Sequence, residues 1–119
     1  MTIIVNGISD PNTSYTSTEQ TITSAALLTL AHGLGTVPFI IQCFVICRIA
    51  EIGYSIGDIL MVDWGGLGAD EGMSVVCDST NIYIRFGVNA NALSATNKTT
   101  GASAALTNAN WSLIVKAIT

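Results

Sequence analysis

The stretch that decides the fold is HGLGTVPFIIQCFVICRIAEIGYSIGDILMVDW, residues 32–64. It joins the longest apolar segment of the chain to clear turn signals. Pro38 fixes its own φ at about −65° and disfavours helix at the preceding residue, so the chain enters the apolar segment already extended. Residues 39–49 are mostly β-branched, aromatic or cysteine, and this composition predicts one long buried strand.

Alternation along this strand separates its side chains into two faces. One face is entirely apolar or cysteine, and it comprises Phe39, Ile41, Cys43, Val45, Cys47 and Ile49. The other face comprises Ile40, Gln42, Phe44, Ile46 and Arg48. Because a strand that is apolar on both faces must be covered on both, and the chain is short, we predict that this second face is an oligomer interface.

The segment AEIGYSIGD, residues 50–58, supplies a reversal after the strand. Gly53 and Gly57 can adopt the positive φ values of tight turns, and Asp58 can accept hydrogen bonds from nearby backbone amides. Tyr54 and Ile56 could fold back between the glycines as a hydrophobic lid. Residues 59–64 then resume an extended pattern, so the stretch predicts a β-hairpin with an elaborated loop.

The first third of the chain predicts an arm followed by a strand. Residues 1–16 are rich in turn formers after a short strand at 2–5, so we expect an N-terminal arm and a β-domain over 17–119. Residues 19–31, EQTITSAALLTLA, begin Thr-rich and become apolar. They are ambiguous between helix and strand, and we predict one strand.

The remainder of the chain predicts further antiparallel pairing. Residues 73–77 and 82–86 alternate on either side of a tight turn at 78–81, which indicates a hairpin. Residues 89–110 are polar with few aliphatic side chains and predict an exposed loop. Residues 111–119 predict a closing strand paired with an early one. The whole predicts an all-β protein, an antiparallel β-sandwich or jelly-roll-like fold of about seven or eight strands.

Composition limits the class of protein. Half of the 119 residues are hydrophobic, only a tenth are charged, and the net charge is −4. The longest apolar run, 37–49, contains Gln42 and Arg48 and is shorter than the ~20 residues of a membrane-spanning helix. Four Lys and Arg in all argue against nucleic acid and against an anionic membrane surface as partners. We expect apolar surface to be buried between subunits.

Candidate chemistry is sparse. His32 could act as a general base, but we predict that its ring nitrogens bond turn backbone. No serine lies in a G-x-S-x-G nucleophile elbow, so we expect no enzyme. Cys43 and Cys47 are about 13 Å apart on one strand, too far for a disulfide. Cys77 could pair with one of them only from an adjacent strand, and we predict buried free thiols.

Two binding interpretations remain open. Carboxylates around a glycine loop could bind Ca²⁺ or be simply solvated, and we predict solvated side chains with no metal or cofactor; they are Asp63, Asp70, Glu71 and Asp78. The aromatic residues Trp64, Tyr54, Tyr83 and Trp111 could form a sugar-stacking surface or pack in the core or at a subunit interface. The exposed binding surface that we predict comprises Tyr54, Trp64, Asp70 and Tyr83. MTIIVNGISDPN has no basic region typical of a signal peptide, so we expect synthesis in a cytoplasm without Sec export.

The order of these features resembles a small β-domain that recurs in tailed-bacteriophage virion proteins. HGLGTVP precedes an apolar strand, AEIGYSIGD precedes another, and VCDSTN forms a hairpin turn; the resemblance covers about residues 20–119. Such domains occur in tail fibres, host-attachment appendages and head-surface proteins. The resemblance implies a non-enzymatic virion component made in the host cytoplasm, homotrimeric or otherwise oligomeric, that contacts other virion proteins and in some cases a host surface glycan.

A more distant similarity is to H-type lectin domains, which are oligomeric β-sandwiches that bind sugars. No residue-by-residue sugar motif of that family can be matched to this sequence. The alternative function is therefore a lectin-like carbohydrate-binding module. The leading expectation is a virion surface protein, either a head decoration or the knob of a fibre or appendage.

Overall fold

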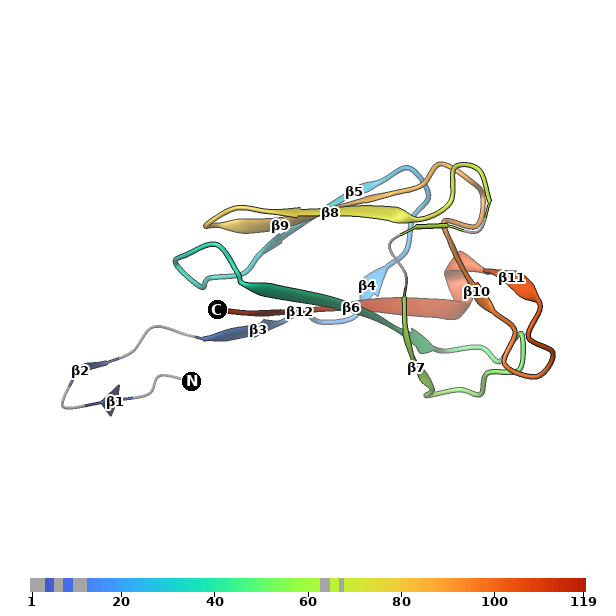
Figure 1. The fold of residues 1–119 in the computed structure, drawn as a ribbon, viewed down its shortest axis with the longest axis horizontal. Helices are drawn as coiled ribbons and strands as arrows, with labels where there is room; N and C mark the ends of the chain where they lie inside the picture. Colours follow the sequence, from blue (N-terminus) through green and yellow to red (C-terminus); the bar gives the residue numbers. More distant parts are fainter. Residues whose placement is uncertain (1–3, 6–7, 10–12, 63–64, 67) are drawn as a thin grey trace.

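The computed structural model describes residues 4–5, 8–9, 13–62, 65–66 and 68–119. It confirms an all-β antiparallel sandwich. Two sheets, one of five strands and one of three, lie face to face as two layers (Figure 1). Their strands together number eight, and two further hairpins bring the strands of the described residues to twelve, against the seven or eight predicted.

The two sheets are built from segments far apart in the sequence. The larger sheet has the order β3-β12-β6-β7, with β4 paired to β12 beside β3. Its strands are β3 (Ser14–Thr16), β4 (Gln20–Thr21), β6 (Ile40–Cys47), β7 (Ile59–Met61) and β12 (Trp111–Ile118). The smaller sheet has the order β5-β9-β8 and comprises β5 (Leu27–Ala31), β8 (Met73–Cys77) and β9 (Asn81–Phe86).

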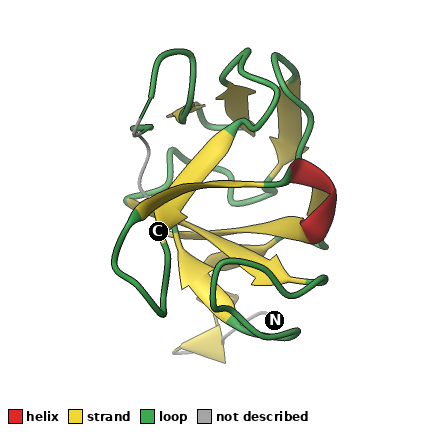
Figure 2. Cartoon of the chain, turned by 90° about the vertical axis from the view of Figure 1, so that its right-hand side faces the viewer, coloured by secondary structure: helices red, strands yellow, loops and turns green. Residues whose placement is uncertain are grey.

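Two short hairpins and one 3₁₀ helix lie outside these sheets. β1 (Ile4–Val5) and β2 (Ile8–Ser9) pair with each other at the N-terminal end. β10 (Leu93–Thr96) and β11 (Ser103–Leu106) form a second hairpin at the opposite end of the molecule. The 3₁₀ helix η1 (Asn108–Asn110) leads from this hairpin into β12, as Figure 2 shows in a view from that end.

The core lies between the two sheets and follows the predicted alternation. β6 pairs with β12 along its whole length, from Cys47 opposite Trp111 to Ile40 opposite Ile118, and with β7 on its other side. The predicted hairpin over 39–64 is therefore confirmed, with β7 ending at Met61. The buried side chains that the sheets contribute are Cys43, Val45, Cys47, Trp111, Leu113, Val115 and Ala117 from the larger, and Leu30, Met73, Ile82, Ile84 and Phe86 from the smaller.

The ends of the predicted long strand are wrong. Phe39 is 86% exposed and Ile49 is 54% exposed, although both were assigned to the buried face. Each lies just beyond β6, where the chain bends away from the paired residues. The alternation of apolar residues continues over 39–49, whereas the hydrogen-bonded pairing of β6 ends at Ile40 and Cys47.

The single strand predicted at 19–31 is also wrong, because the segment divides between the two sheets. β4 pairs with β12, whereas β5 pairs with β9. A turn at Ser24–Ala25 makes the crossing, and Ala25 takes a φ of +63° that normally favours glycine. No glycine, proline or asparagine marks this turn in the sequence, so propensity alone gave no signal.

The exposed loop predicted at 89–110 is a β-hairpin anchored in the core. Leu93 pairs with Leu106, and each is 1% exposed, while Ala92 is fully buried. Between them the strands carry only Ser, Ala and Thr. The sequence did not indicate this hairpin, because such small side chains show no alternation of large apolar and polar residues.

Other predicted pairings are confirmed. β12 pairs with the early strands β3 and β4, and β3 lies within the predicted arm. At the 78–81 turn between β8 and β9, the Asp78 carboxylate accepts hydrogen bonds from the amides of Thr80 and Asn81 at 2.8 and 2.7 Å. Gly53 and Gly57 have the positive φ values predicted for them.

Candidate interaction surface

The outer face of the larger sheet points away from β5, β8 and β9 (Figure 1). It is apolar across β12, β6 and β7. On this face Phe44 lies between Ile114 of β12 and Met61 of β7. In the next row, Ile46 lies between Ser112 and Ile59. We call this surface the outer face; its exposed apolar members are Ile59 (65%), Met61 (59%), Ile40 (45%) and Ile118 (45%), with Phe44, Ile46 and Ile114 half-buried.

The centre of the outer face is hollowed. A groove of about 220 Å³ is lined by Thr16, Phe44, Ile46, Ile59, Ile114 and Lys116. Monomeric soluble proteins rarely expose contiguous apolar patches larger than a few hundred Å². The groove and the apolar rows around it therefore have the character of a surface that a partner covers.

Charged side chains lie on either side of the apolar rows. Lys116 is flanked by Gln42 of β6 and Thr16 of β3. Beyond Ser112, the Arg48 guanidinium donates a hydrogen bond to the Glu19 carboxylate at 2.7 Å. The hydrogen bond from Arg48 lowers the pKa of Glu19, and Ser112 contributes in the same direction.

The predicted interface residues are placed together on this face, with one at its edge. Ile40, Gln42, Phe44 and Ile46 belong to β6 and lie on the same side of the sheet. Arg48 follows the end of β6 and is exposed beside Glu19. The sequence prediction missed the neighbours contributed by β7 and β12, namely Ile59, Met61, Ile114 and Ile118. Alternation in 111–119 placed Ile114 and Ile118 opposite the core positions, and this signal could have identified them.

The predicted exposed binding residues do not form one surface. Tyr83 lies on β9 opposite Val76 and Thr29, and its hydroxyl bonds the Asp78 carboxylate at 3.3 Å. Asp70 lies in the loop before β8, with a φ of +61°. Tyr54 lies in the β6–β7 turn, and Trp64 is outside the described residues. The described members are thus distributed over three parts of the molecule.

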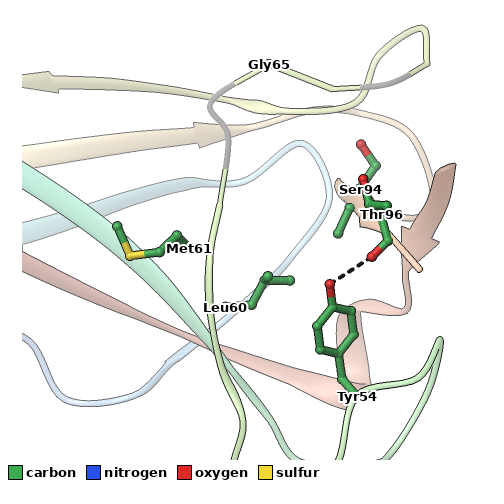
Figure 3. Close-up of a pocket in the computed structure, with 7 residues that line it drawn as sticks. Tyr54, Leu60, Met61, Gly65, Ser94 and Thr96 are labelled. Atoms are coloured by element: carbon green, nitrogen blue, oxygen red, sulfur yellow. Dashed lines mark hydrogen bonds between the residues drawn. The ribbon is translucent and has the colours of Figure 1, made fainter. Parts of the chain in front are cut away.

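Tyr54 borders a small pocket between β7 and β10 (Figure 3). The pocket has a volume of about 190 Å³ and is lined by Tyr54, Leu60, Met61, Gly65, Ser94, Ala95 and Thr96. The Tyr54 hydroxyl donates to the Thr96 carbonyl at 2.8 Å, as the dashed line shows. Its ring packs edge-on against Trp111, with ring centres 5.6 Å apart.

These contacts decide between the two interpretations of Trp111 and correct the predicted hydrophobic lid. Trp111 is only 3% exposed, so it packs in the core and does not belong to a sugar-stacking surface. Ile56 is 68% exposed, so the predicted hydrophobic lid does not include it. Tyr54 alone folds back, and it does so because Trp111 offers the edge-on ring contact and Thr96 the carbonyl acceptor.

Glu51 organises the same end of the molecule and was not singled out from the sequence. Its carboxylate accepts hydrogen bonds from the Trp111 indole (2.7 Å), the Thr107 amide (2.8 Å), the Thr107 hydroxyl (2.9 Å) and the Asn110 side chain (3.1 Å). Burial by itself would raise the pKa of Glu51, but these donors outweigh it and the pKa lies below its usual value. The carboxylate joins the β6–β7 turn to the start of β12.

His32 has the structural role that the sequence predicted. It is 4% exposed. Its Nδ1 accepts a hydrogen bond from the Leu34 amide at 3.0 Å, and its Nε2 lies 2.8 Å from the Asp78 carbonyl. This pattern requires the neutral ring with its proton on Nε2. Since both ring nitrogens bond backbone, His32 ties the 32–38 loop to the β8–β9 turn.

The carboxylates around the glycine loop do not converge on a metal site. Asp70 and Glu71 precede β8, whereas Asp78 follows it, so the length of the strand separates them. Asp63 is outside the described residues. No group of three or more His, Cys, Asp or Glu side chains that could hold a metal ion occurs among the residues that the structure describes.

The three cysteines are free thiols. Cys43 and Cys47 are buried, and Cys77 is half-buried at the end of β8. Burial raises the pKa of the Cys43 thiol to about 11 and also raises the pKa of Cys47. The prediction of buried free thiols is therefore confirmed for Cys43 and Cys47, and Cys77 is partly accessible.

In the described part of the chain, no helix has the length and apolar character needed to cross a membrane. Comparisons with protein-family models, with curated proteins and with solved structures found no match.

Proposed function

We propose that this chain is a non-enzymatic structural protein of the bacteriophage virion surface, either a head decoration or the knob of a fibre or appendage. In this proposal it is made in the host cytoplasm and assembles as a homo-oligomer through the outer face of the larger sheet. The observation that carries the proposal is the apolar outer face, where Phe44, Ile46 and Ile114 line a groove and Ile59 and Met61 are more than half exposed.

Two further observations support the proposal. The only histidine is buried with both ring nitrogens bonded to backbone, which leaves it no role as a general base. The sequence resembles virion β-domains over about residues 20–119, and this resemblance implies a homotrimer or another homo-oligomer. In such a role the partners of the chain are other virion proteins and, for a knob, the host surface.

The proposal is tested by binding to its two candidate targets. The purified protein is mixed with capsid shells that lack it, and separately with host cells before infection. A decoration protein should co-sediment with the shells at saturable stoichiometry, whereas a knob should bind the cells and reduce infection by competition. Failure of both experiments would overturn the proposal.

A glycan array run in parallel addresses the lectin-like alternative. Binding to a defined glycan, without binding to shells or competition with infection, would favour a carbohydrate-binding module outside the virion. No described surface gathers Tyr54, Asp70 and Tyr83 together, so no specific feature now favours that function.

A further inference from the structure

We infer that the outer face pairs with the same face of a second copy about a two-fold axis that crosses β12 at Ile114. This inference rests on the homo-oligomer of the proposed function and specifies its contact. Of the oligomers that the resemblance implies, a homotrimer or another oligomer, it selects a two-fold pair. The reason is the arrangement of charges on the outer face.

The charges on the outer face are placed symmetrically about Ile114. Lys116 lies two residues to one side along β12, and Ser112 lies two residues to the other, each about 7 Å away in an extended strand. On that side the Glu19 carboxylate accepts a hydrogen bond from Arg48 at 2.7 Å, and Arg48 directly follows Cys47, which pairs with Trp111. One side of Ile114 therefore presents the Lys116 cation, and the other side presents the Glu19 carboxylate in its ion pair with Arg48.

A two-fold axis in the plane of the contact reverses the direction of β12 in the second copy. Lys116 of one copy then lies over Ser112 and Glu19 of the partner subunit, and the reverse contact forms by symmetry. Each Glu19 carboxylate lies between the Arg48 of its own chain and Lys116 of the partner subunit. Within its own chain, Lys116 has no ion-pair partner among the described residues. The contact thus supplies an acid to a lysine that lacks one.

The area of the outer face sets the size of the contact. β6 and β12 have eight residues each, β3 and β7 three each and β4 two, so the flat face measures roughly 380 Å² before side-chain relief. A standard interface buries about 800 Å² of accessible surface per partner, so this contact is a small one. Lys116 lies inside the face, because the row formed by Ile118 and Ile40 lies beyond it.

A matched pair of substitutions tests the contact. Ile59 and Val76 are both exposed β-branched residues (65% and 61%), but Ile59 is on the outer face and Val76 is on the smaller sheet. Light scattering of the wild type should give twice the chain mass of 12.4 kDa. Ile59→Asp should give the monomer mass, and Val76→Asp should remain dimeric. Circular dichroism of each variant checks that the fold is retained.

The charge contact has its own test. Lys116→Glu places a carboxylate against Glu19 of the partner subunit, so the dissociation constant should rise about tenfold, and more at low salt than at high salt. Lys116→Gln should have an intermediate effect. An unchanged dissociation constant in Lys116→Glu would overturn the two-fold arrangement even if the protein is dimeric.

Two other results would also overturn the inference. A wild-type monomer at 100 μM would exclude the contact, and a mass of three chains would exclude two-fold pairing. Equal loss of association in Ile59→Asp and Val76→Asp would show that the outer face is not the contact. None of these results depends on binding to shells or cells, so failure of the proposed function would be seen separately.

Discussion

At the scale of single residues, Glu51 is the clearest case of a side chain whose role depends on partners distant in sequence. Four hydrogen bonds reach its carboxylate from Thr107, Asn110 and Trp111. Those donors come from the connection between β11 and β12, and Glu51 itself lies after β6. A carboxylate that accepts this many donors is held in its ionised form.

Replacement of this carboxylate should therefore destabilise the fold. Glu51→Gln loses the charge and converts part of the acceptor group to a donor, so we expect a loss of about 1–2 kcal/mol of unfolding free energy at pH 7. Urea denaturation measures this loss. Asp70→Asn, which removes an exposed charge at a positive φ that asparagine tolerates, serves as the control.

The effect of Glu51 should depend on pH with a definite sign. Its pKa is lower in the folded protein than in the unfolded chain, so its stabilisation is complete above the unfolded pKa of about 4.3. The stabilisation is then lost as the pH falls through the folded pKa. Wild type and Glu51→Gln should accordingly converge in stability at acid pH, and a difference that persisted at pH 2 would contradict the ionised hydrogen-bonded role.

The thiols give a second prediction at this scale. With a pKa of about 11, only about one Cys43 in a thousand is a thiolate at pH 8, and the side chain is also buried. An aromatic disulfide reagent should label Cys77 first and should reach Cys43 and Cys47 only in denaturant. Cys77→Ser should abolish the fast phase, and a fast phase that survived this substitution would contradict the assignment.

At the scale of elements, the β10–β11 hairpin is fixed to the β6–β7 turn. The Lys98 amide donates to the Ile52 carbonyl at 2.9 Å. A Cβ atom on Gly53 would lie 2.5 Å from the Thr99 hydroxyl and 2.8 Å from its amide nitrogen. The absence of a side chain at Gly53 is thus what allows the hairpin tip to approach the turn.

A comparison of Gly53 with Gly57, in the same turn, distinguishes the stability cost of a close contact from the cost of a positive φ. Gly53 and Gly57 have φ values of +84° and +92°, but a Cβ on Gly57 would meet nothing within 4 Å. Gly57→Ala should cost about 1 kcal/mol of unfolding free energy, from the positive φ alone. Gly53→Ala should cost about 2–4 kcal/mol, because the hairpin tip must also move. Thermal and urea denaturation of the two variants measures the difference, and equal losses would show that the hairpin contact contributes little.

At the scale of the whole molecule, the distribution of apolar surface is uneven. The smaller sheet shows Ser74, Tyr83 and Arg85 on its outward side together with the apolar residues Leu27 and Val76. The larger sheet shows more Ile, Phe and Met on its outer face. A sandwich needs only one apolar face per sheet to form its core. The second apolar face of the larger sheet is therefore in excess of what the fold requires.

Association through that face should appear in thermal stability. Because dimerisation stabilises only the folded state, a tenfold rise in protein concentration should raise the wild-type Tm by about 3 °C. Ile59→Asp should show no dependence on concentration, and Val76→Asp should behave as the wild type. A concentration-independent Tm in the wild type, with full reversibility, would contradict association.

The sequence by itself determined the local elements of this protein. Pro38 and the glycine turns delimit the apolar segment, and period-two alternation placed Cys43 and Val45 in the core and Phe44 and Ile46 opposite. It also gave the turn at Asp78. These features follow from backbone preferences and from neighbours within a few residues, which are readable in the chain.

Only the tertiary structure decided which segments lie side by side. The division of 19–31 between two sheets depends on Ala25, which has a positive φ. Long-range pairing stabilises this conformation, including the hydrogen bond that the Ala25 amide donates to the Gly87 carbonyl. The outer face exists as a surface because β7 and β12 bring Ile59 and Ile114 beside β6. Strand order and register depend on contacts between residues tens of positions apart, and no local pattern specifies those contacts.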